Sequence, residues 1–174
     1  QLHEIPAAIE QVLANSEQLA DLAEELIDSK AFIFLGRHVG YPVALEGALK
    51  LKELAYLHAE GFAAGELKHG PIAVIDQGTP VFVVVPPKAR DQLQAKIISN
   101  VQEARGAFTI VLVEEGDDAV VPFADRVIRL PKVPSLLQPL VSTVPLQIFA
   151  CELASRLGHD VDQPRNLAKS VTVE

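Results

Sequence analysis

The chain has 174 residues, which is enough for one domain with a proper hydrophobic core. Its hydrophobic content of 49% and charged content of 22% are typical of a globular domain, and no apolar run approaches the ~20 residues that a membrane span needs. The net charge of −8, without a basic cluster, argues against nucleic-acid binding. The single cysteine excludes an internal disulfide framework and fits a reducing cytoplasm.

The N-terminal segment has a helical pattern. Apolar residues recur at helical spacing through residues 7–27, and Asn15 with Ser16 interrupts the pattern, so we expect a helix or a helix pair. The first residue is Gln and not Met, which suggests a piece of a longer polypeptide. We therefore assign residues 1–28 as a helical connector from an upstream part.

Short apolar runs then alternate with helical patterns. We expect strands at residues 31–35, 58–62, 80–85, 107–113 and 127–130, and helices at residues 42–57, 91–105 and 145–157. This order predicts an α/β fold, a three-layer α/β/α sandwich with a parallel sheet of about five strands. Ligands of such sheets bind beyond the carboxyl ends of the strands, so a site is expected there. Cys151, in the last helix, is expected in the core.

The helix expected at residues 42–57 carries a charged stripe. Glu46, Lys50 and Glu53 fall at i, i+4 and i+7, which puts two carboxylates and an ammonium on one face. The back of this helix is apolar, so the helix should be largely buried and the stripe should face a cleft or an interface. The same spacing is also that of an ordinary surface ion pair.

Three further segments carry candidate polar groups. His69 precedes a Gly-Pro turn and is suited to proton transfer near neutral pH, although a histidine in such a place is more often structural or merely exposed. The loop at residues 36–41 could hold an anion, but we expect Arg37 to pair with a surface carboxylate instead. The tail, residues 159–174, has apolar residues with which it could dock, and it would then carry Lys169 into a cleft.

Two segments resemble a known family, ALEGALKLKELAYLHAEGFAAGELKHGP and DVDQPRNLAKSVTVE. They are similar to the carboxyl-terminal part of the glucosamine-6-phosphate synthases, and the resemblance spans essentially the whole chain. It implies a second sugar isomerase (SIS) domain of flavodoxin-like type at residues 29–158 and a catalytic tail at residues 159–174. The family's glutaminase domain and first SIS domain would be missing upstream partners of the same polypeptide. Because the family binds the sugar phosphate in the first SIS domain, the isolated chain is expected to be weakly active or inactive.

The resemblance implies a cytoplasmic, homodimeric enzyme, an isomerising aminotransferase. It would convert fructose 6-phosphate and glutamine-derived ammonia to glucosamine 6-phosphate without a metal or redox cofactor. Glu53 corresponds to the base that moves a proton between C1 and C2 of the sugar, and Glu46 and Lys50 correspond to neighbours that assist it. His69 corresponds to the residue that opens the sugar ring, and in the family it comes from the neighbouring subunit.

The resemblance also places the tail in the site. Lys169 corresponds to the lysine that forms a Schiff base with the C2 carbonyl, and Ala168, Lys169 and Glu53 are implied to contact the substrate. The residue types fit, since a lysine near cations becomes a better nucleophile and a poorly solvated carboxylate a better base. Lys50, however, stabilises the charged form of Glu53 and would weaken it as a base, so the balance of these two demands stays open.

Two other functions remain open from the sequence. One is a phosphosugar isomerase or deglycase that acts on a related ketose with the same fold. The other is a phosphosugar-binding or dimerisation module without its own turnover.

Overall fold

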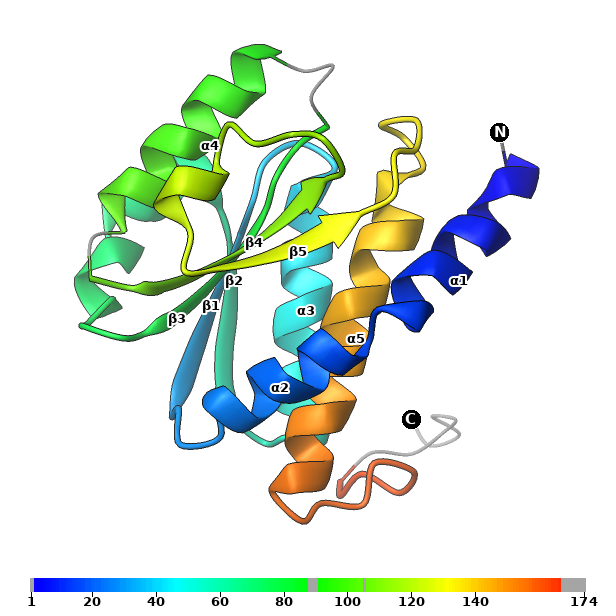
Figure 1. Cartoon of the computed structure of the whole chain (residues 1–174). Helices are drawn as coiled ribbons and strands as arrows, with labels where there is room; N and C mark the ends of the chain where they lie inside the picture. The colour runs from blue at the N-terminus through cyan, green and yellow to red at the C-terminus, as the bar shows by residue number, and fades with distance from the viewer. Residues whose placement is uncertain (1, 88–90, 105, 167–174) are drawn as a thin grey trace, which may run out of the picture.

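Five parallel strands form one sheet in the computed structural model, which describes residues 2–87, 91–104 and 106–166. The strands are β1 (Ala31–Gly36), β2 (His58–Ala63), β3 (Pro80–Val84), β4 (Phe108–Glu114) and β5 (Arg126–Leu130). Their order in the sheet is β2-β1-β3-β4-β5, and all neighbouring strands are parallel (Figure 1). This flavodoxin-like order confirms the predicted α/β class.

Helices cover both faces of this sheet. They are α1 (Ile5–Ala14), α2 (Glu17–Glu25), α3 (Gly40–Leu54), α4 (Asp91–Glu103) and α5 (Gln138–Arg156), with the short 3-10 helices η1 (Leu2–Glu4), η2 (Ala64–His69), η3 (Pro71–Val74) and η4 (Val121–Phe123). α1, α2, α3 and α5 lie on one face, and α4 and η2 lie on the other (Figure 1). The predicted three-layer sandwich is therefore confirmed. In the described part of the chain, no helix is both long and apolar enough to cross a membrane.

The side chains of each central strand alternate between two hydrophobic cores. In β1, Phe34 joins the core under α1, α2, α3 and α5, whereas Leu35 joins the core under α4. Phe34 stacks on Phe82 of β3 with ring centroids 4.9 Å apart, and Phe82 packs in turn against Phe149 of α5. Because both faces of the sheet are covered, the central strands are continuous apolar runs.

The N-terminal helices belong to the same core as α3 and α5. α1 ends at Ala14 and α2 begins at Glu17, so the interruption predicted at Asn15 separates two helices. Buried residues of both helices, such as Val12 and Leu22, pack in the core that α5 helps to form. The division of the chain into connector, domain and tail stays a prediction.

The last helix differs from the prediction in two ways. It begins at Gln138 and contains Pro145, whereas the apolar pattern predicts a start at residue 145. Burial of the first turns, where Val141 is 0% exposed, outweighs the missing N–H of the proline. Cys151 was expected in the core, but it is exposed, because it faces outward one position beyond the buried Ala150.

The turn from β1 into α3 needs a residue without a side chain. A Cβ atom at Gly36 would lie 2.1 Å from the carbonyl oxygen of Gly40, the first residue of α3. A similarly close approach occurs where α3 crosses β2, since a Cβ at Gly61 would lie 2.9 Å from the carbonyl oxygen of Ala44. These two approaches hold α3 tightly against the sheet and fix which of its faces is buried.

Candidate functional site

The predicted charged stripe forms on the outer face of α3. Ala44, Ala48 and Leu51 are buried on its inner face. On the other side, the ammonium of Lys50 donates a hydrogen bond to a carboxylate oxygen of Glu53 and lies 3.6 Å from one of Glu46. These side chains are half-buried, with 25% exposure for Lys50, 26% for Glu53 and 36% for Glu46. One ammonium is thus shared by two carboxylates.

The electrostatics of the stripe keep Lys50 charged. The hydrogen bond to Glu53 raises the pKa of the Lys50 ammonium above its ordinary value, and partial burial opposes this only in part. The negative charges of Glu46 and Glu53 act in the same direction as the hydrogen bond. Lys50 therefore remains an ammonium at neutral pH, which suits it to orient Glu53 and not to act as a nucleophile.

Glu53 lines a cleft at the end of α3. Among the described residues, its lining comes from the last turns of α3, the segment before and into β2, and the tail: Lys52, Glu53, Tyr56, Leu57, His58, Arg165 and Asn166. The cleft has a volume of about 520 Å³, within the usual range for a small-molecule site. Glu46 and Lys50 do not line it, so the stripe meets the cleft only through its last carboxylate.

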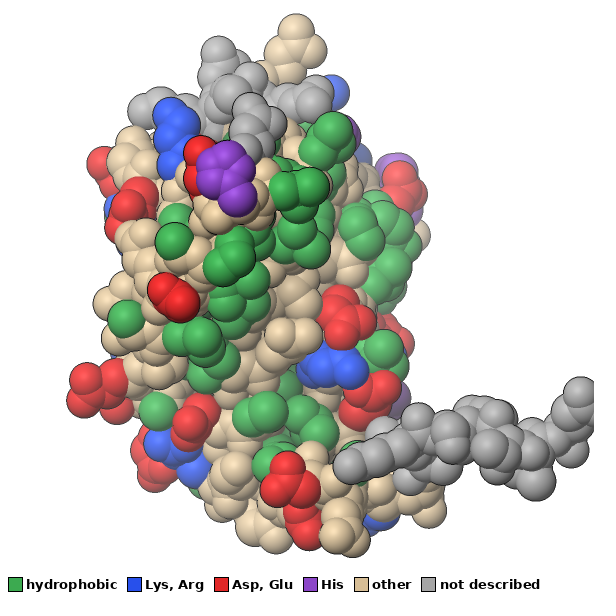
Figure 2. Space-filling view, turned by 90° about the vertical axis from the view of Figure 1, so that its right-hand side faces the viewer, with side chains coloured by type: hydrophobic (Ala, Val, Ile, Leu, Met, Phe, Trp, Pro, Cys, Tyr) green, Lys and Arg blue, Asp and Glu red, His purple; other side chains and the backbone are tan. Residues whose placement is uncertain are grey.

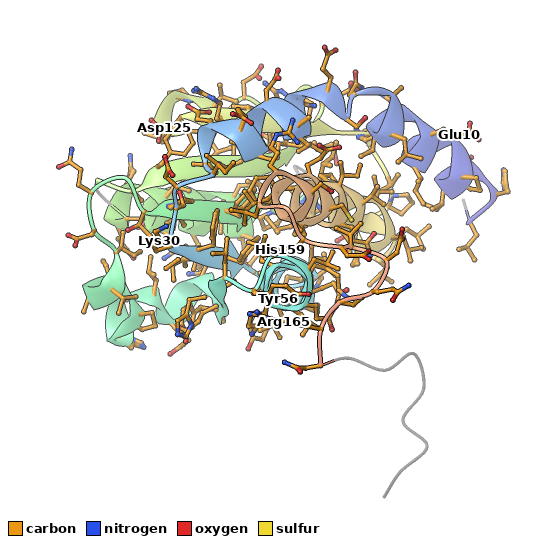
Figure 3. All side chains as sticks on the ribbon, turned by 90° about the horizontal axis from the view of Figure 1, so that it is seen from below. Glu10, Lys30, Tyr56, Asp125, His159 and Arg165 are labelled. Atoms are coloured by element: carbon orange, nitrogen blue, oxygen red, sulfur yellow. The ribbon has the colours of Figure 1, made fainter. Side chains whose placement is uncertain are left out.

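The described part of the tail docks beside Glu53. Arg165 donates its backbone N–H to the Tyr56 hydroxyl at 2.8 Å and holds its guanidinium carbon 4.0 Å from the Tyr56 ring centre. The ring of His159 lies on Tyr56 as well, with the centroids 4.7 Å apart. Figure 3 shows Tyr56, His159 and Arg165 gathered at the end of α3. The tail, which the sequence predicts to dock, does so up to Asn166.

This cleft lies at the opposite end of the sheet from the one expected. Tyr56 and Leu57 come just before His58, the first residue of β2, so the cleft is at the amino ends of the strands. The expected carboxyl-end site followed the general rule for open α/β sheets. α3 runs antiparallel to the strands, so its last turns lie where the strands begin. Side chains on these last turns, such as Glu53, are therefore at the end of the sheet that the rule does not consider.

His69 is not brought to Glu53 within the chain. It lies in η2, after the carboxyl end of β2, so the length of this strand, roughly 15–20 Å, separates the two positions. Its side chain is exposed, and its Nδ1 lies 2.8 Å from a carboxylate oxygen of Glu66. Ala168 and Lys169 lie outside the described residues, and their assigned roles remain predictions.

Arg37 has a different partner from the one expected. Its Nε donates to the side-chain oxygen of Asn100 on α4 at 2.9 Å, and its guanidinium lies against Gly65. Asn100 is buried, so this hydrogen bond holds the loop after β1 against α4 and is not a surface ion pair. No local pattern pointed to Tyr56, because its contact with Arg165 joins positions 109 residues apart.

Replacing the shared ammonium should weaken the fold in a pH-dependent way. Lys50→Met keeps an apolar stem but leaves Glu46 and Glu53 close together, so the free energy of unfolding should fall by about 0.5–1 kcal/mol near pH 8. The pKa of Lys50 is raised above 10.5 in the folded state, so its stabilisation is complete below that value and is lost as the pH rises through the folded-state pKa. The deficit of the variant, measured by chemical unfolding, should therefore begin to shrink only once the pH exceeds 10.5.

Lys52→Met is the matched control, since Lys52 is exposed on the same helix. It should change the unfolding free energy by less than about 0.5 kcal/mol. Equal losses for the two variants, or a deficit of Lys50→Met that does not depend on pH, would contradict the role of the shared ammonium.

Comparison with known proteins identifies the family. The SIS domain family matches residues 25–155. The chain is 66% identical to the glutamine–fructose-6-phosphate aminotransferases (isomerizing) of Corynebacterium efficiens over 176 residues and of Streptomyces coelicolor over 173 residues. These alignments cover 99% and 98% of the chain, which spans 28% of the length of each relative.

A solved structure agrees with these relatives. The C-terminal domain of glucosamine-fructose-6-phosphate aminotransferase from Francisella tularensis has a TM-score of 0.84 and 39% identity, with 93% of this chain and 45% of that chain covered. Since the family match extends over most of the chain, the chain belongs to the SIS domain family.

Proposed function

We propose that the chain forms part of the isomerase site of a glutamine–fructose-6-phosphate aminotransferase, which converts fructose 6-phosphate and ammonia to glucosamine 6-phosphate and water. One observation carries the proposal: a single cleft joins Glu53 of α3 to Arg165 and Asn166, and Asn166 is three residues before Lys169. The names of relatives that are 66% identical support the reaction, and the resemblance described above supports the residue roles.

In this proposal the tail supplies the nucleophile. The amine of Lys169 condenses with the C2 carbonyl of the open-chain sugar and releases water, and ammonia then replaces the lysine nitrogen at C2. The amine must be unprotonated to attack, and nearby cations favour that form. Lys52 and Arg165 in the cleft, with Lys50 one turn away on α3, provide such cations.

Glu53 is the proposed base for the isomerisation. It takes a proton from C1 and returns a proton to C2, which turns the C2 imine into a 2-amino aldose. Its hydrogen bond to Lys50 restricts the carboxylate to one orientation beside the cleft. Glu46 shares the same ammonium, so Lys50 is held between the two carboxylates beside the cleft.

The charge of the cleft supports a phosphorylated substrate. Lys52, His58 and Arg165 line it, and Glu53, the only carboxylate among its described lining residues, is already paired with Lys50. In a chain with a net charge of −8, this is a local concentration of positive charge. An anionic sugar would be attracted to the cleft even if its phosphate is anchored on an upstream domain.

Two features support a homodimer in which His69 acts on the partner's substrate. His69 is exposed and lies at the opposite end of β2 from Glu53, so it would reach a cleft only on a neighbouring subunit. Apolar side chains are also exposed beside the stripe and on α5, with 42% for Leu45, 41% for Leu49 and 48% for Leu140. Figure 2 shows hydrophobic side chains gathered along one face of the molecule, as expected of a surface that meets another protein surface.

The single cysteine fits the cytoplasm as the proposed compartment.

A second candidate function applies to the isolated chain. Because the chain spans 28% of its relatives' length, it would lack the upstream domain that anchors the sugar phosphate in the family. Binding energy from a remote phosphate normally contributes to the rate, and its loss lowers turnover. We propose that the 174 residues alone bind a phosphosugar or self-associate without appreciable turnover.

Removing the proposed base should stop the isomerisation. In a full-length polypeptide, one that carries this chain within the length of its relatives, Glu53→Gln should lower formation of glucosamine 6-phosphate from fructose 6-phosphate and ammonium by about 10²–10⁴-fold. Glu60→Gln, on the exposed side of β2, is the control and should keep the wild-type rate. A rate for Glu53→Gln within about threefold of the wild type would exclude Glu53 as the base.

Mixing two inactive variants tests the subunit exchange of His69. If the site combines Lys169 of one subunit with His69 of the other, a heterodimer of His69→Ala and Lys169→Ala subunits has one intact site and one doubly substituted site. Random assembly of a full-length 1:1 mixture should then recover about one quarter of wild-type turnover, although each variant alone is inactive. No recovery, with heterodimers confirmed by mass spectrometry, would place both residues in one subunit's site.

A further inference from the structure

Tyr56 is the point at which the described tail meets the rest of the molecule. Its hydroxyl accepts the backbone N–H of Arg165 at 2.8 Å, its face carries the Arg165 guanidinium, and its ring packs on His159. These contacts come from two tail residues that are six positions apart, so they hold a segment and not a single side chain (Figure 3).

The backbone of Tyr56 is itself unusual. Its φ of +56° is in the left-handed region, which residues other than glycine seldom occupy and which persists only where the surroundings hold it. This conformation ends α3 and turns the ring toward the tail. Glu53 in the last turn of α3 and Tyr56 just beyond the helix line the same cleft.

We propose that Tyr56 is a positioning residue, which anchors the tail at Arg165 so that Lys169 reaches the cleft beside Glu53. The inference rests on the proposed roles of Lys169 and Glu53. Lys169 follows Arg165 by four residues, so its Cα lies at most about 14 Å from that of Arg165. This length of chain is enough for Lys169 to reach the cleft that Arg165 lines.

The anchor shortens the free chain that carries the lysine. Without it, Lys169 lies thirteen positions beyond the end of α5 at Arg156, whereas it lies four positions beyond Arg165. The effective concentration of a tethered group falls roughly as the −3/2 power of tether length, so the anchor raises it about sixfold. The preset direction of the tail adds to this factor.

The Arg165 amide reports the anchor without any need for activity. In the 174-residue chain, Tyr56→Phe removes the acceptor oxygen but keeps the ring, so hydrogen exchange at the Arg165 amide should become about tenfold faster. Tyr41→Phe is a matched control, because Tyr41 is the only other tyrosine and also lies on α3. It should leave that exchange rate unchanged.

Turnover by the full-length polypeptide tests the consequence of the anchor. Tyr56→Ala should lower kcat about sixfold or more, with the KM for fructose 6-phosphate little changed, because the anchor delivers an amine to sugar already bound. Tyr56→Phe, which keeps the ring contacts, should fall between Tyr56→Ala and the wild type. A merely structural role in the cleft would instead raise KM.

Faster Arg165 exchange in Tyr56→Phe together with the lower kcat supports the inference. Unchanged exchange, or unchanged kcat despite faster exchange, overturns it. Failure of the proposed function is recognised separately, because Lys169→Ala would then keep wild-type turnover whatever Tyr56→Phe does to the Arg165 amide.

Discussion

The close packing of α3 against the sheet is the constraint on which the rest of the site depends. Gly36 lets the chain turn from β1 directly into α3, and Gly61 lets the helix lie against β2 without a side chain between them. With the apolar face buried, the positions of Glu46, Lys50 and Glu53 on the outer face follow from helical periodicity. The charges are half-buried at the edge of the core and not free in water, which strengthens their mutual interaction. The same three residues would form an ordinary ion pair on a solvated helix. Here they hold the carboxylate of Glu53 beside a cleft.

The cleft and His69 occupy opposite ends of the sheet, and this separation explains why the chain by itself holds only parts of a proposed catalytic site. Glu53 and the docked tail are at the amino ends of the strands, whereas η2 with His69 follows a carboxyl end. In the proposed function, a second subunit and an upstream domain complete the site. The exposed leucines beside the stripe and on α5 are consistent with such contacts. In this proposal the fold of one chain supplies the base, Glu53, and the contact that holds the tail. Assembly supplies His69 and the phosphate-binding groups.

Much of the fold could be predicted from the sequence because local patterns determine it. Buried parallel strands are short apolar runs, and the stripe on α3 follows from spacing alone. Predictions failed where tertiary packing decides. Burial carries α5 through Pro145, and the outward direction of Cys151 depends on which face of α5 the sheet covers. Arg37 bonds to the side chain of Asn100, 63 residues away, and the Tyr56 hydroxyl accepts the backbone N–H of Arg165, 109 residues away. No local sequence pattern encodes contacts over such separations. Lys169 was implied by the family resemblance and by no local sequence pattern, and it lies outside the described residues.

Borohydride trapping tests most directly whether the tail supplies the reacting amine beside Glu53. Reduction converts an imine between lysine and fructose 6-phosphate to a stable secondary amine, which peptide mass spectrometry can locate. The full-length polypeptide, incubated with fructose 6-phosphate without an ammonia source, should carry the sugar phosphate on Lys169 and not on Lys50 or Lys52. Lys50 should stay unmodified because its ammonium is held by two carboxylates. An adduct confined to Lys50 or Lys52, or no adduct in a preparation that turns over when ammonia is added, would contradict a Schiff base on the tail.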